Sequence, residues 1–129
     1  MSKIRTKTSN LLIRKVLFIS FILFSDLAKM LDQVVSEINV PGVEIFRHPV
    51  DLVMNPTYAD YIFHPMDLGT IKEKVLKKEY GSTDSFLADM KWIQHNSCIF
   101  NTDTADISII AKKVVRKAEE GCLVSLIEI

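Results

Sequence analysis

Residues 82–101 read STDSFLADMKWIQHNSCIFN, and this stretch indicates the class of fold. Along it, apolar and small side chains recur at intervals of four, three, four and three residues: Phe86, Met90, Ile93, Ser97 and Phe100. This spacing is typical of one face of an α-helix. Ser82 or Thr83 can cap the helix start, because a hydroxyl oxygen there accepts a free backbone N–H of the first turn. We therefore predict a helix that buries this face.

Three further segments have the same helical periodicity. Their inward-facing residues would be Leu27, Leu31, Val34, Val35 and Ile38 in the first, Leu68, Ile71 and Val75 in the second, and Ile107, Ala111, Val114, Ala118 and Cys122 in the last. Asp67 can cap the second of these helices, which we expect to end near Lys78. No strand-like alternation competes with these assignments, so the sequence predicts an all-α protein, an antiparallel four-helix bundle.

The connection between the first two predicted helices, residues 39–66, is unusually long for such a bundle, in which connections have about 2–8 residues. The segment is rich in apolar side chains, and Asn55-Pro56 can start a short helix over residues 58–63 with the proline at its first position. We expect this connection to pack over one end of the bundle. It would leave a cleft beside the loop that follows Phe100, and that cleft is the expected functional site.

The composition excludes several classes of function. A chain of 129 residues has room for one domain, and its 16 basic and 16 acidic residues argue against a surface built for nucleic acid. Cys98 and Cys122 form no CxxC pair and are expected to be thiols of a reducing compartment. The three histidines, His48, His64 and His95, are too far apart for a metal motif. With no nucleophile–base pair and no phosphate-binding glycine loop, we expect no enzyme, no metal and no cofactor.

The N-terminal segment, residues 1–25, is basic and then apolar. Its basic residues are Lys3, Arg5, Lys7, Arg14 and Lys15, and its apolar run is VLFISFILF at residues 16–24. This order imitates a secretory signal, although nine residues are about half of a membrane span. Three interpretations stay open: the start of the first helix, which we favour, a signal or anchor, or a truncated or misassembled start. We therefore expect a division into residues 1–25 and a bundle over residues 26–129.

Residues 64–71, HPMDLGTI, resemble the Pro-Met-Asp-Leu-x-Thr-Ile signature of bromodomains. Further residues of this chain stand at positions that are characteristic in that family: Tyr80, Phe86, Asp89, Asn96, Phe100 and Asn101. The resemblance covers about residues 26–120. Within the family, residues 58–66 and 86–96 are most similar to the chromatin readers that also carry PHD, PWWP and MYND zinc-finger modules, for which this chain has no cysteine clusters.

The resemblance implies a left-handed four-helix bundle that binds acetyl-lysine on histone tails in the nucleus, with neighbouring reader domains as further partners. The residues that would bind the acetylated side chain are Asn101, Tyr58, Phe46, Val50, Phe100 and Ile107. Asn101 would donate to the acetyl carbonyl, and Tyr58 would reach the same oxygen through a water. Asp89 and Asn96 are expected to hold the long connection in place rather than to touch the ligand.

The chain departs from the family pattern at the proposed pocket. Glu44-Ile45-Phe46 stands where most bromodomains have Trp-Pro-Phe, and Phe100 replaces the common tyrosine. The loss of the Trp-Pro shelf should loosen the grip on the peptide around the acetyl-lysine. It also supports an alternative function, a degenerate bromodomain that acts as a protein-interaction scaffold beside other reader domains. A third hypothesis, a membrane or secreted helical protein, depends on residues 1–27 alone.

Overall fold

The computed structural model describes the backbone of residues 2–128 and the side chains of these residues except 2–9, 20–22, 24 and 126–128. The elements are α1 (Ser2–Ser36), the 3-10 helix η1 (Val43–Phe46), α2 (Tyr58–Tyr61), α3 (Leu68–Leu76), α4 (Thr83–Asn101) and α5 (Asp106–Glu128). Residues 2–128 contain no strand. The two short helices lie in the connection between α1 and α3, where only α2 was predicted.

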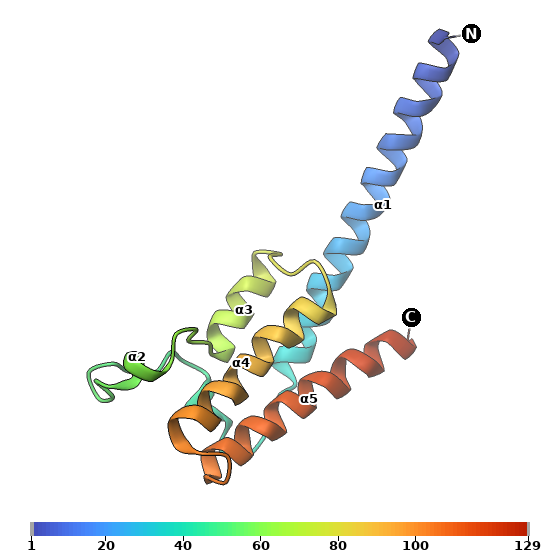
Figure 1. Cartoon of the computed structure of the whole chain (residues 1–129). Helices are drawn as coiled ribbons and strands as arrows, with labels where there is room; N and C mark the ends of the chain where they lie inside the picture. The colour runs from blue at the N-terminus through green and yellow to red at the C-terminus, as the bar shows by residue number, and fades with distance from the viewer. Residues whose placement is uncertain (1, 129) are drawn as a thin grey trace.

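The four longer helices run alternately down and up, and α4 and α5 pack along each other as an antiparallel pair (Figure 1). Helix α1 contacts α3, α4 and α5 through its C-terminal part, and its N-terminal part projects beyond the bundle (Figure 1). The long connection carries η1 and α2 to the end of the bundle opposite this projection (Figure 1). The predicted all-α four-helix bundle with a long connection between its first two helices is therefore confirmed.

The core lies between α1, α3, α4 and α5. Its largest fully buried side chains include Leu31, Ile71, Phe86, Met90 and Val114, so α1, α3, α4 and α5 all contribute. All of the inward-facing residues predicted from periodicity are buried except Leu27, Phe100 and Ile107, which are partly exposed. Burying a leucine, isoleucine or phenylalanine side chain contributes about 1.5–3 kcal/mol, so this shared face stabilises the bundle.

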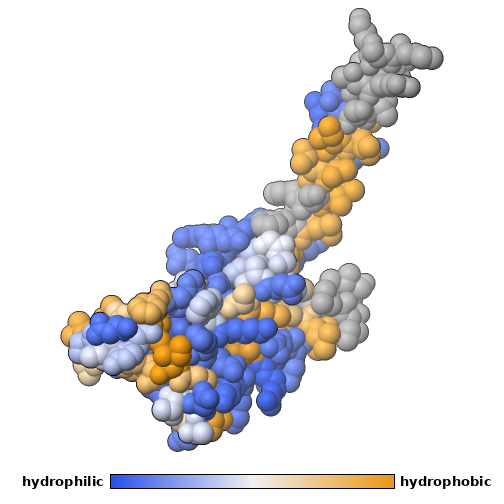
Figure 2. Space-filling model, viewed as in Figure 1, coloured by the Kyte–Doolittle hydropathy of each residue, from blue (hydrophilic) through white to orange (hydrophobic). Residues whose placement is uncertain are grey.

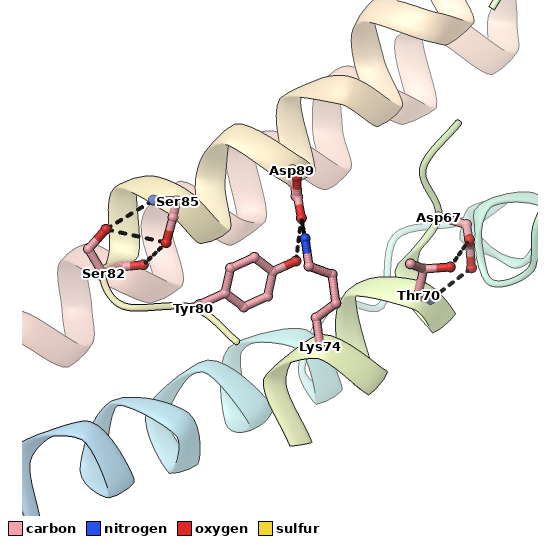
Figure 3. Close-up of polar contacts among 7 residues, drawn as sticks. All are labelled: Asp67, Thr70, Lys74, Tyr80, Ser82, Ser85 and Asp89. Carbon is pink, nitrogen blue, oxygen red and sulfur yellow. Dashed lines mark hydrogen bonds and ion pairs between the residues drawn. The ribbon is translucent and has the colours of Figure 1, made fainter. Parts of the chain in front are cut away.

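Capping side chains set where two of the helices begin. The Asp67 carboxylate accepts a hydrogen bond from the Thr70 backbone N–H at 3.0 Å, and the Ser82 hydroxyl accepts one from the Ser85 N–H at 3.1 Å (Figure 3). Both predicted caps are confirmed, Ser82 being the residue of the pair that caps α4. The prediction for the short helix is wrong in detail, because α2 ends at Tyr61 and Pro56 lies before its N-cap position, Thr57, whose side chain makes no capping hydrogen bond.

Asp89 joins α4 to α3 and to the segment between them. Its Oδ2 accepts a hydrogen bond from the Tyr80 hydroxyl at 2.6 Å and pairs with Lys74 Nζ at 2.5 Å (Figure 3). Burial and this hydrogen bond raise the pKa of Tyr80. The prediction that Asp89 holds the connection between α1 and α3 is therefore wrong. Its partners are Lys74 on α3 and Tyr80 in the segment between α3 and α4. Both lie closer to Asp89 than the connection does.

The N-terminal part of α1 is exposed and apolar. Large apolar side chains on it are more than half exposed: Leu11, Leu12, Ile13, Val16, Leu17, Phe18, Ile19 and Leu23 (Figure 2). The side chains of Lys3, Arg5, Lys7, Phe21, Ile22 and Phe24 lie outside the described residues. Among the described residues, no helix combines the length and apolar character needed to cross a membrane. The helix is continuous through residue 25, and the division of the chain at that point stays a prediction.

Candidate functional site

A cavity of about 280 Å³ lies where the connection between α1 and α3 meets the end of α4 and the start of α5. This is the position that the sequence predicted for a functional cleft. All six predicted site residues line it: Phe46, Val50, Tyr58, Phe100, Asn101 and Ile107. Such a volume is near the lower end of small-ligand pockets, so the cavity suits one extended side chain rather than a large molecule.

Each wall of the cavity comes from a different element. Phe46 is the last residue of η1 and is partly buried, and Val50 follows it in the connection. Tyr58 begins α2, and its ring meets that of Phe100 on α4 edge to face, with 4.9 Å between the ring centroids. Ile107 stands in the first turn of α5. The site therefore depends on α4, α5 and the connection with its two short helices, η1 and α2, being held together.

Two polar groups in the cavity have no partner within the described part of the chain. The Asn101 side chain and the Tyr58 hydroxyl make no hydrogen bond there, although Asn101 is half-buried and Tyr58 is only 6% exposed. Both groups can reach solvent. Among the described residues, the only polar side-chain atom that is fully buried and lacks a partner is Asp32 Oδ1. Burial raises the pKa of Tyr58, so its hydroxyl stays protonated at neutral pH. An amide and a hydroxyl are thus available to a ligand.

Asn96 holds the connection against α4, as predicted. Its Nδ2 donates to the backbone carbonyl oxygen of His64 at 2.8 Å, and the Asn96 side chain is buried. At the other end, Gly69 allows a close approach, because a Cβ there would stand 2.6 Å from the carbonyl oxygen of Arg47. These two contacts fix the stretch that carries Val50 and Tyr58, so the cavity wall has a defined position.

The buried hydroxyls of Ser97 and Ser108 lie next to the turn that follows Asn101. The Ser108 side chain is fully buried, and its Oγ donates to the Thr102 carbonyl oxygen at 2.6 Å and lies 3.0 Å from Ser97 Oγ. Thr102 has φ 80° and ψ 158°, a backbone conformation in which glycine is nearly the only residue found. The chain therefore turns sharply after Asn101, and Ser108 holds the turn. This pair was not predicted, because no motif spacing in the sequence links Ser97 to Ser108.

Other cavity residues also went unpredicted as site residues. They are Glu44, Ile45, His48, Pro49, Asp51, Asn55, Met66, Asp67, Ile93, Asn96 and Ser97. Ile93 and Ser97 were predicted on the same face of this helix as Phe100, but as core residues and not as residues of the site. Ile45, at the position of the missing shelf proline, is 58% exposed and gives the mouth of the cavity only a partial apolar wall. Among the described residues, no group of three or more His, Cys, Asp and Glu side chains could hold a metal ion.

Comparison with known proteins agrees with this geometry. The Bromodomain family model matches residues 27–113. Over 78 residues, 59% of this chain, the sequence is 40% identical to transcription factor GTE10 of Arabidopsis thaliana. It is 37% identical to the human bromodomain-containing protein 9 over 70 residues, a segment that covers 54% of this chain. It is 32% identical over 78 residues to the MYND-type zinc finger-containing chromatin reader Zmynd8 of Drosophila melanogaster, covering 60% of this chain.

The matched segments span only 7%, 12% and 5% of the lengths of these three relatives, respectively. The resemblance seen in residues 64–71 and 80–101 is thereby confirmed, and one relative is a MYND-type chromatin reader, as the sequence suggested. The family match covers the cavity-lining residues from Glu44 to Ile107 and the elements that position them. This chain belongs to the bromodomain family.

Proposed function

We propose that this chain is an acetyl-lysine recognition module that binds acetylated histone tails as a nuclear chromatin reader and transcription regulator. The observation that carries the proposal is the unpartnered side-chain amide of Asn101 in a largely apolar cavity beside the Tyr58 hydroxyl. Bromodomains are reader modules and not a catalytic family. We expect no cofactor, no direct nucleic-acid contact and no membrane contact from this domain.

The chemistry of the cavity fits an acetylated lysine side chain. Acetylation removes the lysine charge and leaves an amide whose carbonyl needs a donor and whose methyl and butyl groups need apolar walls. The Asn101 NH₂ would donate to that carbonyl, and a water on Tyr58 would reach the same oxygen. Phe46, Val50, Phe100 and Ile107 would supply the walls. An unmodified ammonium would lose its hydration there, which costs several kcal/mol.

The names of the relatives support a role in transcription and chromatin, and therefore a nuclear location. One is a transcription factor, one a subunit of transcription initiation factor TFIID, and one a chromatin reader. Neighbouring reader domains are proposed as further partners, because the chromatin reader carries a MYND-type zinc finger in addition to the matched segment. Which acetylated lysine is bound depends on the rim of the cavity.

A second candidate function is a protein-interaction scaffold whose pocket no longer binds acetyl-lysine. Exposed apolar side chains on the connection favour it: Leu52 is 54%, Val53 is 88% and Met54 is 77% exposed. These residues, together with Phe63 at 87%, could pack against a neighbouring domain. The two functions differ in one measurable property, because only the reader requires the acetyl group and Asn101.

Calorimetry with an acetylated histone peptide would test the proposal, using Asn101→Ala and, as a matched control, Asn39→Ala. Asn39 is exposed and lies outside the cavity lining. Losing the hydrogen bond costs about 1 kcal/mol, and leaving the acetyl carbonyl without a donor costs about 1–3 kcal/mol more. Asn101→Ala should therefore weaken binding by about thirty- to a thousandfold. Unchanged affinity in Asn101→Ala, with the fold intact by circular dichroism, would place the binding site elsewhere.

A further inference from the structure

The charged side chains that line the largely apolar cavity are acidic. The lining includes the carboxylates of Glu44, Asp51 and Asp67 and contains neither lysine nor arginine, with His48 as its one further titratable side chain besides Tyr58. Asp67 is buried and engaged as the cap of α3. Glu44 and Asp51 are exposed and both come from the connection, which forms one rim of the mouth. The chain as a whole is neutral, so this concentration of negative charge is local.

Neither rim carboxylate is fully neutralised within the protein. Glu44 Oε2 pairs with Arg47 Nε at 2.9 Å, but the two side chains are 77% and 37% exposed. A surface pair of this kind contributes little, so an incoming cation can share or replace Arg47. Asp51 Oδ1 accepts the backbone N–H of Val53 at 2.8 Å, whereas the described residues include no cation paired with this carboxylate.

Glu44 also occupies the position where most bromodomains have the shelf tryptophan. The flat ring there would mainly contact the aliphatic part of a ligand and carries no net charge. A carboxylate at the same place, on the rim of the cavity, would attract positive charge on the neighbouring residues of the peptide. Glu44 in place of the tryptophan therefore makes the rim favour positively charged peptides, and the second rim carboxylate, Asp51, adds to this effect.

We propose that Glu44 and Asp51 make the site select acetylated peptides that carry a cationic side chain, lysine or arginine, next to the acetyl-lysine. The inference rests on the proposed function and adds the class of peptide to it. The carboxylates are exposed, so each should contribute about 1.5- to fivefold in affinity, and together they should favour a cationic neighbour by roughly two- to twentyfold. The preference should weaken as salt rises, because exposed charges are screened.

Three peptides that share one acetyl-lysine and differ only in the two adjacent residues would test this. Those residues are arginine, citrulline, which keeps the shape of arginine without its charge, or glutamate. Calorimetry on the whole chain should give the tightest binding for arginine and the weakest for glutamate. The double variant Glu44→Gln, Asp51→Asn should bind the arginine and citrulline peptides equally. It keeps an oxygen acceptor for the Val53 N–H, so the connection should retain its shape.

Two further variants sharpen the test. Glu119→Gln removes the same charge from an exposed position of α5 outside this cavity and should leave the preference unchanged. Arg47→Gln releases Glu44 from its pair and should increase the preference. Equal binding of the arginine and citrulline peptides by the unaltered chain would overturn the inference while leaving the proposed function standing. A preference that survives in the double variant would also overturn it, and failure of all three peptides to bind would overturn both proposals.

Discussion

The strained residue next to Asn101 provides a sharp test of the loop geometry. Thr102 has φ 80° and ψ 158°, and its side chain is exposed. A non-glycine residue in this region costs about 1–3 kcal/mol. Replacing threonine by glycine removes that cost but increases the entropy of the unfolded chain, which costs about 0.4–1 kcal/mol. Thr102→Gly should therefore stabilise the protein by about 0.5–2 kcal/mol.

The matched control is Thr104→Gly in the same loop. Thr104 is exposed, and among the described non-glycine residues only Lys78 and Thr102 have positive φ, so glycine brings no relief at position 104. It should destabilise by about 0.4–1 kcal/mol. Urea unfolding followed by circular dichroism measures both changes, and each kcal/mol should move the melting temperature by about 4 °C. If Thr102→Gly destabilises as Thr104→Gly does, the strained turn after Asn101 is not present in solution.

Two other predictions concern stability. Ser108→Ala should destabilise by about 1–3 kcal/mol, because it leaves the Thr102 carbonyl and Ser97 Oγ without their buried partner, whereas Ser125→Ala, which removes a hydrogen bond near the end of α5, should cost less in the same urea titration. Burial raises the pKa of Cys122 and of Tyr58, so the folded state retains protons that the unfolded chain releases. These two groups should therefore lower the unfolding free energy only above about pH 8, as pH rises through the ordinary cysteine and tyrosine pKa values. Cys122→Ala should delay that fall, and no decline between pH 8 and pH 10.5 would contradict the prediction.

The helices and their caps could be predicted because they depend on local order. The four-three spacing through Phe86 and Phe100 determines which face of α4 is buried, and the preference of Asp67 for an N-cap depends only on the next three residues. The six cavity residues could be predicted because the family resemblance aligned them. Whether they meet around one cavity is a property of the fold, and the structure brings them together.

What could not be predicted depends on the direction of side chains and on loop dihedral angles. Asp89 lies on a predicted helix face, yet whether its carboxylate meets the connection or Tyr80 and Lys74 depends on how α3 packs. The positive φ of Thr102 is invisible in a sequence that has no glycine there. The Ser97–Ser108 pair likewise joins residues on two helices whose relative rotation no periodicity specifies.

The most direct test of the central claim compares one histone peptide with and without a single acetyl group on its lysine. Titration of each into the isotopically labelled protein, followed by backbone amide shifts, reports both affinity and location. The acetylated peptide should shift the amides of Tyr58, Asn101 and Ile107 in a saturable way. The unmodified peptide should leave them unchanged, because an ammonium that enters the cavity would lose its hydration. Equal shifts with both peptides, or none with the acetylated one, would contradict acetyl-lysine recognition by this chain.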